Sequence, residues 1–183
     1  EPLNPAQRER LVTAMAEVET LMNAAAVTIA AEPADCEAAR FCLDAYFCEL
    51  AKRFETGFDP TKGSSAPDDA ALSPPHGCFL IARLHGEPIG CGGLRTLEPA
   101  IGEIKRMWVA PHARGLGVAK RLLGALEERA RAMGMRLVRL DTNRVLTQAQ
   151  AMYRMAGYRE IERFNDNPYA DFWFEKELCG NDN

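Results

Sequence analysis

The sequence lacks several features that would point to a common class at once. No apolar run approaches the roughly 18 residues needed to span a bilayer, so no membrane attachment is expected. Positive charge is not in excess, because 22 basic residues stand against 26 acidic ones, which argues against a nucleic-acid partner. The six cysteines form no C-x-x-C pair, and no histidine lies at ligand spacing. Structural zinc is therefore not expected, and a reduced, cytoplasmic protein without a visible secretory signal is favoured.

Length and composition indicate one domain, or one domain with a short appendage. The 183 residues are 47% hydrophobic, which suffices for a core without disulfides or metals. Apolar periodicity predicts helices over 5–26, 34–54, 116–133 and 146–156, and strands over 27–30, 79–82, 89–97, 101–109, 136–141 and 171–178. Residues 55–76 form one long polar loop, a kind of segment that is often functional. Strands gathered first and then interleaved with helices predict an α/β or α+β protein with a mixed sheet.

The segment VAPHARGLGVAK at 109–120 contains a strand end, a turn and a glycine-rich stretch that opens into a helix. The first turn of a helix has N–H groups without intrahelical partners, and its dipole end is positive. Gly115 and Gly117 let a phosphate approach this backbone, and Arg114 and Lys120 add positive charge. The segment therefore predicts a ligand with a diphosphate group. Two other diphosphate-binding loops do not fit, since no Gly-Lys is followed by Ser or Thr and the third glycine of G-x-G-x-x-G is Lys120 here.

The pattern R-x-x-G-x-A at 114–119 resembles the acetyl-CoA-binding motif of the GNAT superfamily of N-acetyltransferases. The strand sequence EIKRMWV at 103–109 precedes it, and AQAMYRMAGY at 149–158 resembles the A-x-x-x-Y-x-x-x-G-F signature, with Tyr158 in place of Phe. The resemblance covers roughly residues 27–178. It implies the GNAT fold: a central mixed, mostly antiparallel sheet flanked by helices, whose fourth and fifth strands (103–109 and 136–141) splay apart.

The resemblance also implies acetyl-CoA as acyl donor, and no metal. The pantetheine arm would pair with the fourth strand like an added strand, and the pyrophosphate would bind the N–H groups that follow it. The residues expected to bind the cofactor are Met107, Trp108, Val109, Arg114, Gly115, Leu116, Gly117, Val118, Ala119, Lys120 and Asn143. Asn143 departs from the family spacing, which would place an asparagine at Leu146. Asn143 either bonds to the pantetheine or caps the next helix, and both interpretations stay open.

Two residues are expected to carry the catalysis. Glu103 resembles the general base that takes a proton from the acceptor ammonium. Met107 lies roughly 13 Å further along an extended strand, so a water relay is favoured; the alternative is a solvated carboxylate paired with nearby cations. Tyr153 occupies the position of the acid that protonates the departing thiolate, or else it is a core residue of an apolar stripe. The polar loop 165–169 either lines the acceptor site or is an ordinary turn.

The function implied by the resemblance is direct transfer of the acetyl group from acetyl-CoA to an amine, on a small molecule or a protein, without an acyl-enzyme. The alternative is a catalytically weak acyl-CoA-binding sensor attached to a MarR-type transcription regulator, because residues 3–22 resemble the last helix of such regulators. We accordingly expect 1–26 to be a helix or linker that could end a preceding winged-helix domain, 27–178 to be the acetyltransferase domain, and 179–183 to be a tail. A homodimer is one possible assembly.

Overall fold

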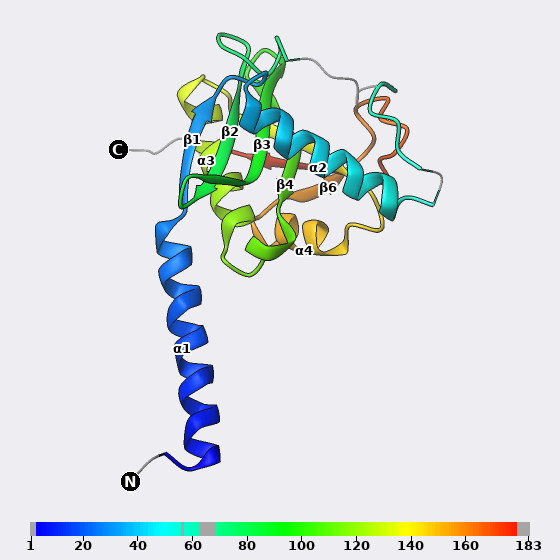
Figure 1. Ribbon diagram of the computed structural model, residues 1–183. Coiled ribbons are helices and arrows are strands. Elements are labelled where there is room, and N and C mark those ends of the chain that lie inside the picture. The colour runs from blue at the N-terminus through cyan, green and yellow to red at the C-terminus, as the bar shows by residue number, and fades with distance from the viewer. Residues whose placement is uncertain (1–2, 56, 63–68, 179–183) are drawn as a thin grey trace.

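The sheet of this protein has helices on both faces, and one long helix projects from it (Figure 1). The computed structural model describes residues 3–55, 57–62 and 69–178. In chain order the elements are α1 (Pro5–Ala26), β1 (Thr28–Glu32), α2 (Glu37–Arg53), β2 (Gly77–Leu84), β3 (Glu87–Glu98), β4 (Ile101–Val109), the 3₁₀ helix η2 (Pro111–Ala113), α3 (Val118–Ala132), β5 (Leu137–Thr142), α4 (Thr147–Met155), β6 (Arg159–Ile161) and β7 (Phe172–Glu177). The predicted C-terminal tail lies outside the described residues.

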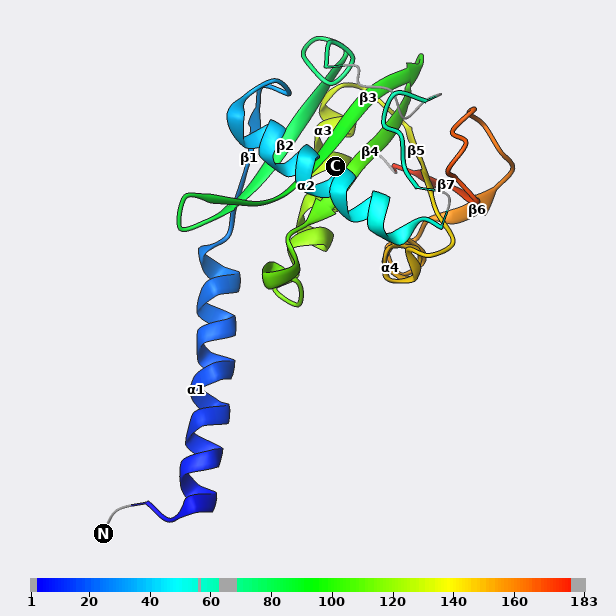
Figure 2. The same ribbon diagram turned by 45° about the vertical axis from the view of Figure 1, so that its right-hand side comes forward.

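The seven strands form one mixed, mostly antiparallel sheet in the order β1-β2-β3-β4-β5-β7-β6. Strands β1 to β4 form an antiparallel meander, and β7 pairs antiparallel with both β5 and β6. Among the strands of the described residues, β4 and β5 are the one pair that runs parallel. In Figure 2, α2 lies in front of the meander and α3 lies behind it. This arrangement confirms the predicted fold class.

The pairing of β4 with β5 ends early, and this divides the sheet. Three pairs join them, from Ile101 opposite Leu137 to Glu103 opposite Arg139. Beyond Glu103, β4 continues along β3 while β5 continues along β7. Arg106 marks the change, because its φ of 57 is left-handed and interrupts the regular twist of β4. The predicted splay of these strands is therefore present.

Close packing of α3 on the sheet depends on glycine in β3. A Cβ at Gly92 would lie 2.7 Å from Sδ of Met107 and 2.9 Å from Cδ1 of Leu126, so no larger residue fits without movement. The helix presents six buried residues to the sheet, namely Val118, Leu122, Leu123, Leu126, Glu127 and Ala130. This stripe matches the apolar period from which the helix was predicted.

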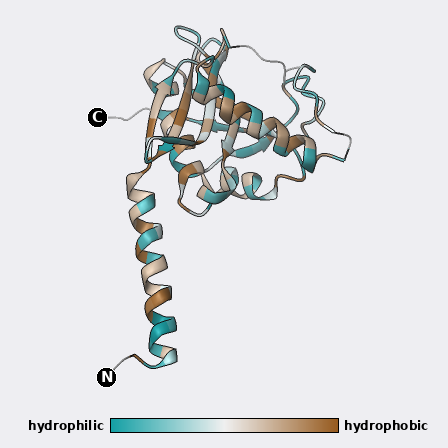
Figure 3. Cartoon of the chain, viewed as in Figure 1, coloured by the Kyte–Doolittle hydropathy of each residue, from teal (hydrophilic) through white to brown (hydrophobic). Residues whose placement is uncertain are grey.

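Helix α1 extends away from the sheet and buries none of its 22 residues (Figure 1). It begins where Asn4 closes the first turn: the Asn4 side chain accepts a hydrogen bond from the N–H of Gln7 at 2.9 Å, and the Gln7 side chain accepts one from the N–H of Asn4 at 2.9 Å. Several of its large apolar side chains are exposed. Figure 3 shows hydrophobic and hydrophilic stretches alternating along the projecting helix. Among the described residues, no helix is long and apolar enough to cross a membrane.

The end of α1 is held by α3. Arg121 donates from Nη1 to the carbonyl oxygen of Ala24 at 2.8 Å and from Nη2 to that of Val27 at 2.7 Å. These are carbonyls of the last turn, which have no intrahelical donor and favour a nearby positive charge. The contact fixes where α1 joins the domain.

Element boundaries differ from the prediction by a few residues, each for a local reason. The second helix starts at Glu37 rather than 34 because Cys36 is its N-cap and accepts from the N–H of Ala39. The third starts at Val118 rather than 116 because Gly117 has a left-handed φ. Strand β6 was missed because three residues are too few to show a period.

Candidate active site

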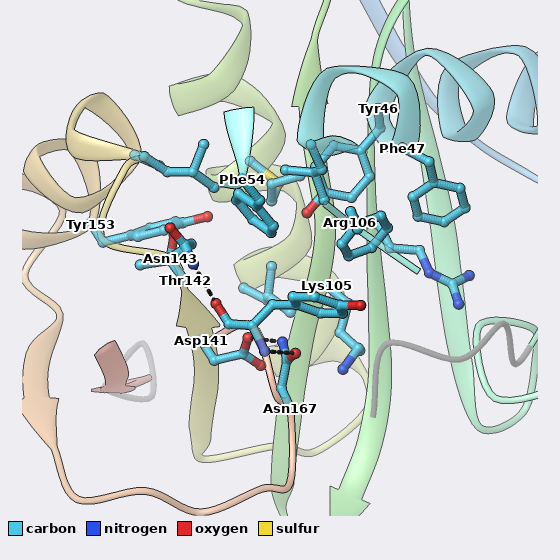
Figure 4. Close-up of a pocket in the computed structure, with 17 residues that line it drawn as sticks. Tyr46, Phe47, Phe54, Lys105, Arg106, Asp141, Thr142, Asn143, Tyr153 and Asn167 are labelled. Carbon is cyan, nitrogen blue, oxygen red and sulfur yellow. Dashed lines mark hydrogen bonds between the residues drawn. The ribbon is translucent and has the colours of Figure 1, made fainter. Parts of the chain in front are cut away.

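The divergence of β4 and β5 opens a cleft that holds two adjoining cavities. The aromatic cavity, of about 730 Å³ with its open mouth, is lined by Tyr46, Phe47, Leu50, Phe54, Phe58, Ile104, Lys105, Arg106, Met107, Asp141, Thr142, Asn143, Leu146, Ala149, Tyr153, Asn167 and Tyr169 (Figure 4). The glycine-loop cavity, of about 850 Å³, is lined by Arg53, Met107, Trp108, Val109, Arg114, Ala119, Leu146, Thr147, Gln148, Ala149, Met152 and Tyr153. The two share Met107, Leu146, Ala149 and Tyr153, so ligands in the two cavities can meet.

The segment that joins η2 to α3 passes through two left-handed residues. Gly115 has a φ of 89 and Gly117 a φ of 74. A Cβ at either position would have no atom within 4 Å, so glycine is needed there for the backbone angle rather than for space. Helix α3 starts directly after Gly117. Its free N–H groups and positive dipole end therefore lie beside the glycine-loop cavity.

Five of the residues expected to bind the cofactor line the glycine-loop cavity: Met107, Trp108, Val109, Arg114 and Ala119. Among the others, Val118 is buried in the core, Leu116 is half-buried, and Gly115, Gly117 and Lys120 are exposed. The structure thus brings the predicted loop and the predicted strand edge to one cavity. Residues 115–119 have no polar side chain, so they can offer a ligand only their backbone groups, whereas Lys120 also offers its ammonium group.

Glu49 of α2 holds two of these side chains in place and was not identified from the sequence. Its Oε2 accepts from Nη2 of Arg114 at 2.6 Å and from Nε1 of Trp108 at 3.0 Å. Arg114 also donates from Nε to the carbonyl oxygen of Val109 at 3.2 Å. The bond between Glu49 and Arg114 joins α2 to the glycine loop beside the glycine-loop cavity.

Asn143 lies at the aromatic cavity, where its side chain joins β5 to the 165–169 loop. Its Nδ2 donates to the carbonyl oxygen of Tyr169 at 2.6 Å, and its Oδ1 accepts from the N–H of Val145 at 3.0 Å. The N-cap of α4 is Leu146, so the interpretation of Asn143 as a helix cap is wrong. Its bond to pantetheine stays a prediction.

Tyr153 stands where the two cavities meet. It is 5% exposed, and its ring lies 5.8 Å from that of Tyr158 and 6.1 Å from that of Phe174. Its hydroxyl points into the aromatic cavity (Figure 4). Burial, helped by the charge of Asp141, raises the pKa of the Tyr153 phenol above its ordinary value, so the hydroxyl keeps its proton at neutral pH. The ring is part of the core, and the hydroxyl still faces the cleft.

Glu103 is fully buried, while its neighbours Ile104 and Lys105 line the aromatic cavity. Its Oε2 lies 2.6 Å from both Nε and Nη2 of Arg95, which is its register partner on β3. Its Oε1 accepts from Nζ of Lys105 at 3.2 Å and from Nδ2 of Asn165 at 3.0 Å. The carboxylate is therefore separated from the cavity by the groups that bind it. Its role as general base stays a prediction.

Asp141 is a carboxylate on the cavity wall that sequence analysis missed. Its Oδ1 accepts from Nδ2 of Asn165 at 2.8 Å, and its Oδ2 accepts from Nδ2 of Asn167 at 2.5 Å. Burial raises the pKa of Asp141 above its ordinary value, although the charge of Lys105 opposes the shift. The available signal was its place near the carboxyl end of the strand predicted to run beside the fourth.

Aromatic side chains form the outer wall of the aromatic cavity, and they too were not identified from the sequence. The ring of Phe58 lies 4.8 Å from that of Tyr169, 5.5 Å from that of Phe47 and 5.8 Å from that of Phe54. The Tyr169 hydroxyl accepts from the N–H of Asp59 at 2.8 Å, which ties residues 57–59 to the 165–169 loop. The structure thus places part of the 165–169 loop in the cavity wall. Among the described residues, no group of three or more His, Cys, Asp or Glu could hold a metal ion.

The sheet is split between two parallel strands, with a glycine loop and a helix start at one cavity and the carboxylate of Asp141 at the next, so it can hold a phosphorylated ligand beside a second molecule. Residues 44–158 match the model of the acetyltransferase (GNAT) family. The chain belongs to that family, and its acyl donor is acetyl-CoA.

Relatives and solved structures agree with this family. The chain is 36% identical over 112 residues to an IAA acetyltransferase of Azospirillum brasilense, covering 61% of this chain and 72% of that one. A crystal structure of an acyl-CoA N-acyltransferase from Klebsiella pneumoniae superposes with a TM-score of 0.68 at 26% identity, covering 84% of this chain and 98% of that one. An aminoglycoside 6'-N-acetyltransferase complexed with coenzyme A shares the fold, with a TM-score of 0.61 at 14% identity over 85% and 99% of the two chains.

Proposed function

We propose that the protein transfers the acetyl group of acetyl-CoA directly to the amine of a small acceptor held in the aromatic cavity. The observation that carries this proposal is the junction of the two cavities at Met107, Leu146, Ala149 and Tyr153. A donor thioester in the glycine-loop cavity would meet an acceptor at this junction. Such positioning alone can supply much of a transfer rate.

The donor would lie along the edge of β4 that β5 leaves unpaired. Beyond Glu103 that edge has no β5 partner, so the backbone of Met107, Trp108 and Val109 can bond to the pantetheine amides. The pyrophosphate would bind the N–H groups from Gly115 to Lys120 at the start of α3, with Arg114 beside it. Asn143 would be a further contact of the arm.

Tyr153 would protonate the departing thiolate. Its hydroxyl faces the aromatic cavity, and Tyr153 also lines the glycine-loop cavity. Its raised pKa means that it enters the reaction protonated. A phenol can give a proton to a thiolate, whose conjugate thiol has an ordinary pKa of about 8.5, only when the thiolate is formed next to it, as the junction allows. Cys91 does not compete as a nucleophile, because it is fully buried and donates to the carbonyl oxygen of Arg106 at 3.3 Å.

Glu103 would act from behind the cavity wall rather than by contact with the acceptor. It binds Lys105, which lines the aromatic cavity, and Asn165, which also donates to Asp141. A proton transfer to Glu103 would pass through these groups or through water.

Replacement of Tyr153 by Phe tests the proposal. Wild-type enzyme should release free thiol from acetyl-CoA when a panel of small amines is supplied. The Phe variant should show a turnover number lower by at least tenfold, with acetyl-CoA affinity within twofold of wild type, because only the transferable proton is lost. Ring volume is kept, so the melting temperature should hardly change.

The control is Tyr158→Phe, since Tyr158 packs against Tyr153 but does not line the cavity. Equal turnover of wild type and the Tyr153 variant would make Tyr153 a packing residue alone. Absence of acetyl-CoA binding by the wild-type protein in calorimetry would contradict the whole proposal.

A further inference from the structure

Two carboxylates lie next to each other in this cleft, and one amide joins them. Nδ2 of Asn165 donates to Glu103 at 3.0 Å and to Asp141 at 2.8 Å, while its Oδ1 accepts from Nε1 of Trp173 at 2.9 Å. The Trp173 contact fixes which way the amide faces. Both carboxylates are therefore oriented by the same side chain.

The two carboxylates differ in what else binds them. Glu103 is held by two cations, Arg95 and Lys105, and is 0% exposed. Asp141 is held by two neutral amides, Asn165 and Asn167. A carboxylate has about four lone-pair positions, so one bond to each oxygen leaves capacity for a further donor.

Asp141 also faces the groups that would surround an acceptor. Figure 4 shows it on the wall of the aromatic cavity beside Asn167 and below Tyr153. Tyr46 on α2 and Tyr153 on α4 line the same cavity as Asp141, and the charge of Asp141 contributes to the raised pKa of both phenols. Lys105 of β4 is the cation that faces it, and Glu103 is the other acid.

We propose that Asp141 is a catalytic residue, which binds the ammonium group of the acceptor and takes its proton, and that Glu103 is a positioning residue acting through Lys105 and Asn165. This inference rests on the proposed function. In the step, an N–H bond of the ammonium breaks and its proton passes to Asp141. The freed lone pair forms the N–C bond to the acetyl carbon, and the C–S bond breaks. A second proton leaves the nitrogen as the thiolate becomes a thiol by way of Tyr153, and Asp141 later returns its proton to solvent.

Charge balance supports this division of roles. Arg95 and Lys105 carry two positive charges near Glu103 and Asp141, which carry two negative ones. Arg106 also lines the aromatic cavity, and its Nη1 lies 3.7 Å from Oδ1 of Asp69, which balances its charge. An acceptor ammonium adds a positive charge to a buried site, where an unbalanced charge is costly. Passing its proton to Asp141, and then to solvent, removes that excess. The raised pKa of Asp141 makes it a better proton acceptor than an ordinary carboxylate.

The remaining wall defines the acceptor class as a small primary amine with an aromatic or other apolar body. Phe54, Phe58 and Tyr169 present rings to the cavity, and the hydrogen bond from Asp59 to Tyr169 closes the wall across two loops. Rings of this kind favour apolar groups and also attract an ammonium at their faces. We therefore use 2-phenylethylamine as the probe.

The first measurement is binding of 2-phenylethylamine in the presence of coenzyme A, where no transfer can occur. Wild-type protein should bind the amine, and Asp141→Asn should weaken binding at least tenfold. Asp166→Asn is the matched control, because Asp166 is exposed and lies between Asn165 and Asn167 in the same loop. It should bind as wild type does. Failure of the wild-type protein to bind the amine overturns the inference, and so does undiminished binding by Asp141→Asn.

The second measurement is kcat/KM against pH with acetyl-CoA and the same amine. In wild type the rate should fall as pH drops through the raised pKa of Asp141, because the base becomes protonated. Asp141→Asn should lower kcat/KM at least 10²-fold and should abolish this fall at low pH, the acidic limb of the profile. Its acetyl-CoA affinity should stay within twofold of wild type. Asp141→Glu should keep at least tenfold more activity than Asp141→Asn. Glu103→Gln should lower the rate and keep the limb.

The outcomes separate this inference from the proposed function. Binding that depends on Asp141 without any acetylation contradicts the proposed function and leaves Asp141 as the ammonium site. Acetylation by wild type that persists in Asp141→Asn, with its acidic limb intact, overturns the inference and leaves the function. Loss of the limb in Glu103→Gln but not in Asp141→Asn returns the base to Glu103.

Discussion

Helices α1 and α3 were both predicted from apolar residues at three- and four-residue steps, but they have opposite surroundings. Helix α3 buries six of its 15 residues against the sheet, whereas α1 buries none of its 22. In α1 the large apolar residues are exposed, namely Leu11, Val12, Met15, Val18, Leu21 and Met22. The comparison teaches that a helical period predicts a helix and does not predict what covers it.

The largest expected effect is on stability, from truncation of the buried face of α3. Leu126→Ala should lower the free energy of unfolding by about 2–5 kcal/mol, because Leu126 is fully buried beside Gly92 and the sheet can only partly close the cavity left behind. Denaturant unfolding measures this. A loss below about 1 kcal/mol would show that α3 packs more loosely than the structure indicates.

A smaller effect is expected on binding, from the residue at which α3 begins. Gly117→Val should raise the dissociation constant of acetyl-CoA at least tenfold, about 1.4 kcal/mol, because a β-branched residue is strained at a φ of 74 and would move the N–H groups that follow. Calorimetry on the folded variant measures this. Gly124→Ala is the control, since a Cβ there also meets open space and its backbone is helical. Equal affinity of the two variants would exclude the loop from cofactor binding.

The smallest effect is expected from α1. Met15→Ala should change the free energy of unfolding by less than about 0.5 kcal/mol and leave acetyl-CoA turnover unchanged, because Met15 is 62% exposed and α1 lies outside the cleft. The same denaturant titration compares it with Leu126→Ala. A loss above about 1.5 kcal/mol would mean that this face of α1 is covered in solution, and the contrast between the two helices would fail.

Local sequence signals predicted most of the fold and half of the cleft. The glycine loop could be found because its strand end, turn residues and helix start are contiguous in the chain. The structure places Arg95 opposite Glu103, a pairing that was not predicted from the sequence. The aromatic cavity joins α2, the end of β5 and the 165–169 loop, which are far apart in the chain. No local pattern marks Phe58, and Asp141 had only its place near the end of a predicted strand, because the tertiary fold alone brings the two residues to one wall.

The two hydrogen bonds from Arg121 give α1 a fixed direction as it leaves the domain. Val27 is the single residue between α1 and β1, so the chain has few torsion angles with which to reorient the helix. At 1.5 Å per residue, α1 is about 33 Å long, comparable to the diameter of a small domain. A fluorophore attached near its exposed start would therefore tumble with the whole molecule. A protein joined ahead of Pro5 would be held at a set distance and orientation from the acetyl-transfer cleft.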